Sequence, residues 1–191
     1  MVSDPNQRNG AGANPGSPGL PIYQPRYSLK GKSKVIFDAL TSFDINKLKS
    51  ILARIELVDS LSMPDLYDED GHNLLHRAAY DNTFRISEYL LTFYKQRLAQ
   101  HLKNLECERQ GKTSPDQLNA ETYNNIKNEV RTRVAQWINT PSRSEQGFYP
   151  LHFASFHGNI HLIKLLMRNK ADYKVKTSEG INMLHVAAQG D

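Results

Sequence analysis

The sequence predicts an all-α solenoid built from stacked pairs of helices. A motif of Gly, any three residues and then Leu-His occurs three times, over residues 71–76, 147–152 and 180–185. The last two copies begin 33 residues apart. Apolar residues at helical spacing follow the first two copies. A fixed period of this length indicates repeats that bury their apolar faces against one another.

The first helix of each repeat is expected directly after the glycine. We expect Gly71, Gly147 and Gly180 to adopt a left-handed backbone at the loop tip. Asn73 and Asn182 are predicted N-caps, and Pro150 suits a first helical position. The motif leucines are expected to face the core; they are Leu75, Leu151 and Leu184. The motif histidines are expected to bond nearby backbone rather than a metal; they are His76, His152 and His185.

The second helix of each repeat carries the amphipathic pattern. Ile86, Tyr89 and Leu90 have the same spacing as three leucines of the next full copy, Leu162, Leu165 and Leu166. A weaker copy, with Leu48, Ile51 and Leu52 at these positions, begins near Val35. We therefore expect about four repeats in residues 35–191, the first degenerate and the last ending after its first helix.

Between the second and third repeats lie 43 extra residues. The apolar spacing of residues 90–105 predicts one long helix, which Gln110-Gly111-Lys112 ends. Ser114 as N-cap and Pro115 in the first turn are expected to open a second helix running to Asn139. The insertion, at about 95–138, is therefore predicted to be a helical hairpin.

Residues 1–34 differ in composition from the rest. They contain five prolines and five glycines, and their few apolar residues have no helical or strand period, so we expect a disordered tail. This tail carries the whole net charge of +4, since residues 35–191 hold 19 basic and 19 acidic side chains. The repeats therefore have no basic excess for nucleic acid, and the five basic residues of the tail are too dispersed for a typical polybasic membrane anchor.

The chain has few features of an enzyme or a secreted protein. Its one cysteine, Cys107, has no pattern of catalytic partners, and no phosphate-binding loop or nucleophile elbow occurs. His157 and His161 flank a predicted turn without a carboxylate at ligand spacing. We expect no catalytic residue, metal or cofactor. Without a signal peptide or an apolar run long enough to span a membrane, the segment is expected to be cytoplasmic.

The repeats resemble the ankyrin repeat, strongly over residues 68–94 and 139–191 and weakly over 35–67. Lys170 departs from the family pattern, which has a glycine after the second helix, and this should cost about 1 kcal/mol if the backbone stays left-handed. The resemblance implies a protein partner, and we expect a monomer that binds no nucleic acid. It places the partner-binding residues on one concave face: Glu69, Asp70, His72, Tyr80, Asp81, Glu145, Gln146, Phe148, Phe156 and His157.

Two interpretations of the aromatic members of this set remain open. Tyr80, Phe148 and Phe156 are either exposed anchors for a partner, or they pack on a neighbouring repeat or under the insertion. The acidic run of residues 68–70 is either a solvated loop tip or a contact for a basic partner.

A narrower resemblance concerns residues 148–154 and 180–191. They are similar to the N-terminal ankyrin region of protist Asp-His-His-Cys palmitoyltransferases, in which cytosolic repeats recruit substrates. This implies that the chain is the N-terminal part of a longer membrane enzyme, tethered at the cytosolic face. The alternatives are the ankyrin scaffold of a non-enzymatic protein and the cytosolic region of an ion channel.

Overall fold

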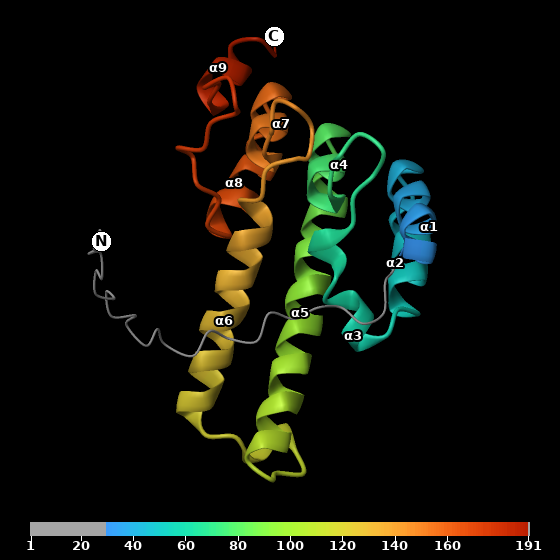
Figure 1. Ribbon diagram of the computed structural model, residues 1–191, viewed down its shortest axis with the longest axis vertical. Coiled ribbons are helices and arrows are strands. Elements are labelled where there is room, and N and C mark those ends of the chain that lie inside the picture. Colours follow the sequence, from blue (N-terminus) through green and yellow to red (C-terminus); the bar gives the residue numbers. More distant parts are fainter. Residues whose placement is uncertain (1–29, 191) are drawn as a thin grey trace, which may run out of the picture.

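The computed structural model describes residues 30–190 and is helical throughout (Figure 1). The described part contains no β-strand, only two isolated bridges, Tyr67 to Asn73 and Lys176 to Asn182. The predicted all-α class is confirmed, whereas most of the tail expected to be disordered lies outside the described residues. The elements are α1 (Lys30–Thr41), α2 (Ile45–Ala53), α3 (Leu57–Ser60), η1 (Met63–Asp65), α4 (Leu74–Tyr80), α5 (Phe84–Arg109), η2 (Pro115–Gln117), α6 (Ala120–Ile138), α7 (Pro150–Phe156), α8 (Ile160–Arg168) and α9 (Met183–Ala187).

The helices form two layers. In the first layer α4 packs between α1 and α7, and α7 packs on α9. In the second layer α5 packs on α8, and α2, α5 and α8 each pack on the first helix of their own repeat. Small residues at Ala78, Ala79 and Ala154 are buried where neighbouring first helices meet, so the helices approach closely. One continuous core runs through the stack from Ile36 to Ala171.

The starts of the first helices follow the motif as predicted. The Asn73 side chain accepts hydrogen bonds from the backbone of Leu75 and His76, both at 3.0 Å. His76 Nδ1 in turn accepts from the backbone N–H of Asn73 at 3.3 Å. Asn182 and His185 repeat this arrangement in α9. The loop glycines have the expected positive φ, as Gly71 at 77° illustrates.

The first repeat begins earlier than expected. Helix α1 starts at Lys30, so residues 30–34 of the expected disordered segment are helical. Ile36, Ala39 and Leu40 form a buried stripe that holds this helix on the stack. The turn before the stripe carries mainly exposed residues, which extend the helix at little cost because Lys and Ser are tolerated in helices.

The insertion is a helical hairpin made by α5 and α6, which run side by side and project away from α4, α7 and α9 (Figure 1). Trp137, 1% exposed, meets Tyr94 edge to face with ring centroids 4.9 Å apart. The expectation that Ser114 opens the second helix is wrong. Ser114 caps only the short turn η2, and α6 begins at Ala120 behind the N-cap Asn119.

The late start of α6 has a packing reason. Leu118, between η2 and α6, is extended and buried in a small cluster with Cys107 and Ile126 at the tip of the hairpin. A helix continuing through Leu118 would lose this contact, so the chain turns there first. Asn119 then accepts from the backbone N–H of Thr122 at 2.8 Å.

Leu184 is not in the core, contrary to expectation. It is 71% exposed, because no described helix packs against that side of α9. Lys170 does adopt the expected left-handed backbone, with φ of 70°, as do Gly158 at 58° and Asn82 at 55°. Phe43 is also left-handed, at 57°, which the sequence did not indicate.

Candidate functional site

The first-helix layer carries a pocket of about 400 Å³ on its concave side. Its walls come from the end of α4, the loop before α7, α7 itself, and the loop and helix of the last described repeat. We call this the concave pocket, and its lining residues are Tyr80, Phe148, Phe153, Phe156, His157, Ile181, Val186 and Gln189. Four of these were predicted to bind a partner: Tyr80, Phe148, Phe156 and His157.

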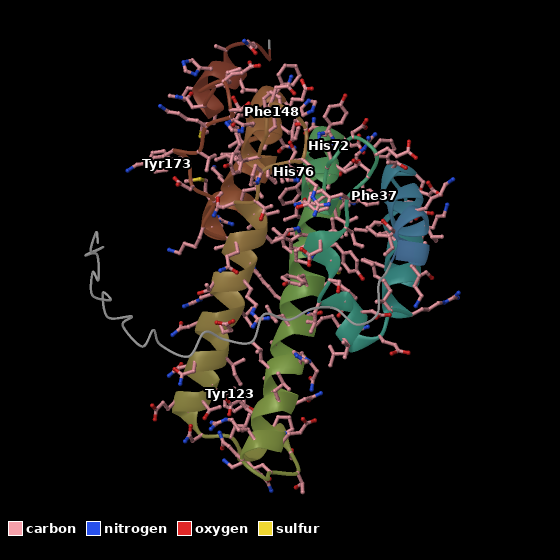
Figure 2. All side chains as sticks on the ribbon, viewed as in Figure 1. Phe37, His72, His76, Tyr123, Phe148 and Tyr173 are labelled. Atoms are coloured by element: carbon pink, nitrogen blue, oxygen red, sulfur yellow. The ribbon has the colours of Figure 1, made fainter. Side chains whose placement is uncertain are left out.

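Phe153 is the centre of an aromatic cluster in this pocket. Its ring meets Tyr80 edge to face at a centroid distance of 5.5 Å and lies 5.6 Å from Phe148. His72, from the loop before α4, lies 5.2 Å from Phe153 and stacks on Tyr80 at 5.6 Å. Figure 2 shows His72, His76 and Phe148 gathered where α4 and α7 meet. The cluster is preorganised, because each ring is held by another in a favourable geometry.

The three predicted aromatics differ in how far they are buried. Tyr80 is 49% exposed and Phe156 is 43% exposed, so both present ring surface to solvent. Phe148 is half-buried and packs on Phe153 and His152. Exposed aromatic rings beside a preformed hollow are typical anchors of a protein interface.

Two polar candidates near the pocket are engaged within the chain. His157 Nε2 lies 2.7 Å from the carbonyl oxygen of Tyr80 and so ties repeat three to repeat two. The Asp81 side chain is largely covered, and its Oδ2 accepts from Arg77 Nε at 3.0 Å. Asp81 is therefore covered at the end of α4, whereas His157 is exposed and contacts the Tyr80 carbonyl from the solvent side.

The acidic run lies beyond the pocket around the same arginine. The Nη1 atom of Arg77 is 3.9 Å from an Asp68 oxygen and 3.5 Å from an Asp70 oxygen. Burial alone would lower the pKa of Arg77, but Asp81, Asp68 and Asp70 raise it. Asp68, Asp70 and His72 bring possible metal-ligand atoms within 4.8 Å of one another, yet the guanidinium already supplies the positive charge there. Glu69 is exposed at the loop tip.

The loop before α7 contacts the next loop through its backbone. The Ser178 hydroxyl donates to the Glu145 carbonyl at 2.9 Å, and the Ser178 N–H donates to the Gln146 carbonyl at 2.9 Å. The Glu145 side chain is exposed, whereas Gln146 is half-buried. Neither residue lines the concave pocket, so the predicted set divides into a pocket group and a loop-tip group.

Two of the motif histidines, His76 and His152, are buried parts of the scaffold behind the pocket. Burial, followed by the neighbouring His72, lowers the pKa of His76 to about 3, against a smaller opposing effect of the Phe148 and Thr140 carbonyls. Burial also lowers the pKa of His152. Because Nδ1 of each ring accepts a backbone hydrogen bond, the proton of the neutral ring is on Nε2.

Sequence reasoning missed Phe153, Ile181, Val186 and Gln189. Phe153 occupies the position after the motif histidine, one residue before the small pair. That position faces the preceding repeat on the concave side. Its place in the repeat motif could have indicated this from the sequence alone. The other three belong to the last described repeat, which closes one side of the pocket by packing α9 on α7.

Within residues 30–190, no helix combines the length and the apolar character required to cross a bilayer. The longest, α5, has 26 residues and is strongly charged.

The fold and the concave face define a class of protein, and the comparisons with known proteins agree with it. Residues 146–178 match the family described as the ankyrin repeat, which is the segment from the loop before α7 to the loop before α9. The fold is accordingly an ankyrin-repeat solenoid, a class whose repeats bind other proteins.

A particular relative narrows this class. Over 125 residues the chain is 26% identical to palmitoyltransferase AKR1 of the yeast Lachancea kluyveri. The match covers 65% of this chain but 16% of the relative. The similarity therefore concerns a small part of that enzyme.

Proposed function

We propose that this chain is a protein-interaction module that recruits a partner or substrate protein through the concave pocket. The observation that carries the proposal is the pocket itself, a hollow of about 400 Å³ with Tyr80 and Phe156 exposed at its rim and Phe153 at its base. Such a hollow accepts one or two apolar side chains of a partner, which lose water when they meet preorganised rings.

We further propose that the module is the cytosolic N-terminal part of a membrane protein S-palmitoyltransferase, acting as a monomer. Support comes from the similarity to a palmitoyltransferase over most of the chain and from the resemblance of residues 148–154 and 180–191 to ankyrin regions of that family. In this arrangement the repeats hold a client protein, and the chemistry is performed elsewhere in the enzyme.

Binding is tested with peptides selected by the full chain from a displayed library of linear sequences. Affinities of the selected peptides are then measured by fluorescence anisotropy for the parent, Tyr80→Ala and Phe156→Ala. Each substitution should weaken binding by about tenfold or more, as truncation of an interface anchor does. Tyr173→Ala is the matched control, because Tyr173 is similarly exposed but lies apart from His72 and Phe148 (Figure 2).

Recruitment is tested in cells that express the full-length protein. Capture of palmitoylated proteins on a thiol resin should show a defined set of clients that lose the modification in the Tyr80→Ala, Phe156→Ala double variant but keep it in Tyr173→Ala. Equal modification of all proteins in both variants would contradict a recruiting role. Unchanged peptide affinity in both pocket variants would contradict the pocket as the binding surface.

A further inference from the structure

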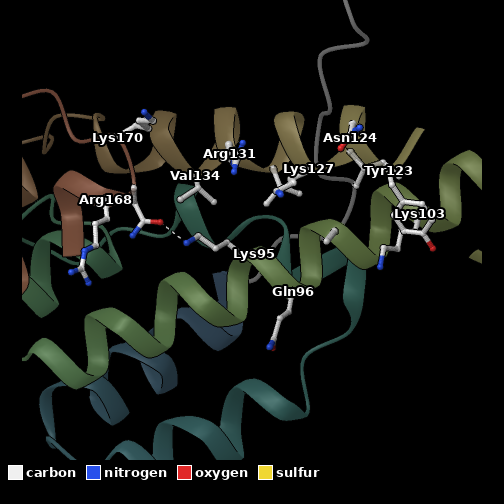
Figure 3. Close-up of a pocket in the computed structure, with 14 residues that line it drawn as sticks. Lys95, Gln96, Lys103, Tyr123, Asn124, Lys127, Arg131, Val134, Arg168 and Lys170 are labelled. Carbon is white, nitrogen blue, oxygen red and sulfur yellow. Dashed lines mark hydrogen bonds between the residues drawn. The ribbon is translucent and has the colours of Figure 1, made fainter. Parts of the chain in front are cut away.

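The hairpin carries a second hollow, separate from the concave pocket, of about 740 Å³. It lies between α5 and α6 and ends at the C-terminus of α8 (Figure 3). Six basic residues line it: Lys95, Lys103, Lys127, Arg131, Arg168 and Lys170. None of its lining residues is acidic. We call this hollow the basic groove.

The cations and the apolar residues are arranged in a pattern across the groove. Lys95 and Lys103 come from α5, and Lys127 and Arg131 from the facing side of α6 (Figure 3). Four apolar residues also line the groove: Ala99 and Val130 are half-buried, and Ile126 and Val134 are buried. The groove therefore has basic residues on both helices and apolar residues among them. The methylene stems of the lysines add to its apolar surface.

These charges have little compensation among residues 30–190. No ion pair of the described residues involves any of the six. Lys95 donates to the Asn169 side-chain oxygen, and Lys103 lies over the Tyr123 ring at 5.3 Å, but both of these partners are neutral. Burial lowers the pKa of Lys95. Residues 35–191 have equal numbers of basic and acidic side chains, so the excess of positive charge in this groove is not a property of the whole domain.

Lys170 lies at the end of the groove in a left-handed turn. This residue has φ of 70°, a conformation that glycine adopts without strain. A lysine there leaves the helix end less stable than a glycine would, and its side chain lines the groove. The Lys170 carbonyl accepts from the Asn139 side chain at 2.8 Å, and the Lys170 side chain adds a sixth cation at the end of the groove.

We propose that the basic groove binds an acidic amphipathic helix of a partner protein. Its carboxylates meet the lysines and arginines on both walls, and its apolar side chains lie on the floor between them. The lining residues of α6 extend from Tyr123 to Val134, about 16 Å at 1.5 Å per residue, which matches three turns of a bound helix. A single phosphate would meet only a few of them, and a flat bilayer would not reach the floor.

The probe is a synthetic twelve-residue peptide with a leucine row flanked by glutamates, and the protein is the full chain of 191 residues. Affinity is measured by fluorescence anisotropy for the parent and for Lys127→Glu with Arg131→Glu, both exposed positions. The double reversal should weaken binding by about tenfold or more, and binding to the parent should weaken as salt rises. Lys127→Gln with Arg131→Gln should give an intermediate loss.

The matched control is Arg85→Glu with Lys164→Glu, which makes the same charge change at exposed positions outside the groove. It should bind the peptide within about twofold of the parent. A glutamine-for-glutamate peptide and a scrambled peptide should both bind weakly. Helical circular dichroism must be equal in all variants. The Tyr80→Ala, Phe156→Ala variant should keep full affinity for this peptide, which separates the groove from the concave pocket.

Three results would overturn the proposal. The first is no binding of the acidic peptide to the parent, and the second is equal loss in the groove variant and its control. The third is tighter binding to vesicles containing phosphatidylserine or to single-stranded DNA than to the peptide, with that binding lost in the groove variant. The third result would assign the groove to a membrane or a nucleic acid instead.

Discussion

The ends of helix α8 offer a paired test of how left-handed residues set the stability of this solenoid. Gly158, in the turn before α8, has φ of 58°, and Lys170, after α8, has φ of 70°. A Cβ placed on Gly158 meets no heavy atom within 4 Å. Gly158→Ala therefore changes the backbone energy without a steric clash, and Lys170→Gly makes the opposite change.

The expected magnitudes follow from this geometry. A side chain in the left-handed region costs about 1–2 kcal/mol, and the greater freedom of glycine in the unfolded chain offsets part of that. Gly158→Ala should lower the free energy of unfolding by about 1 kcal/mol, and Lys170→Gly should raise it by about 1 kcal/mol. Each change corresponds to about 2–4 °C in Tm for a chain of this size.

Urea unfolding followed by circular dichroism at 222 nm measures both changes. The two positions lie at opposite ends of α8, whose 9 residues span about 13 Å at 1.5 Å per residue, so the double variant should return close to the parent. The slope of the unfolding free energy against urea concentration should stay constant, because neither substitution changes the surface exposed on unfolding. The reasoning is refuted if Lys170→Gly destabilises the protein or if Gly158→Ala has no effect. Lys170→Gly should also bind the acidic peptide more weakly, so that stability and affinity change in opposite directions.

Three further predictions concern buried residues. Since the pKa of His76 is lowered to about 3, its folded form stays neutral while the unfolded form gains a proton below pH 6.5, so stability is lost as pH falls. Between pH 7 and 5 this should remove about 2 kcal/mol from the free energy of unfolding in urea titrations, and His76→Gln should remove most of that dependence. Trp137→Ala should cost about 3–5 kcal/mol by the same assay, because the ring is buried between α6 and α5, whereas a cost below about 1 kcal/mol would mean that the hairpin is loosely docked. Asn73→Ala should cost about 1–2 kcal/mol by removing two cap hydrogen bonds, and Asn73→Ser should recover part of it; equal costs would contradict the capping role.

The sequence predicted the repeat architecture well because its signals are local. The loop glycines, the caps at Asn73 and Asn182, and the motif histidines each act within a few residues of their own position. The hairpin could be predicted for the same reason, because the spacing of apolar residues within each segment indicates its two long helices. Such features need no knowledge of which distant segments meet.

The errors and omissions have long-range causes. The start of α6 depends on Leu118 meeting Cys107 across the hairpin, and the exposure of Leu184 depends on which helices lie beside α9. The basic groove could not be predicted, because its cations come from α5, α6 and the end of α8. The engagement of His157 with the Tyr80 carbonyl, 77 positions away, likewise required the fold.

Helix α5 belongs both to the second repeat and to the hairpin, and this has a consequence for how the molecule unfolds. Simple solenoids lose their repeats one after another, because each touches only its neighbours. Here one helix of 26 residues, about 39 Å long, packs on α4, α6 and α8 and is contacted by α3. Opening the hairpin or the second repeat disturbs the other, so these parts should exchange their amide hydrogens as one cooperative unit, with α1 and α9 opening first.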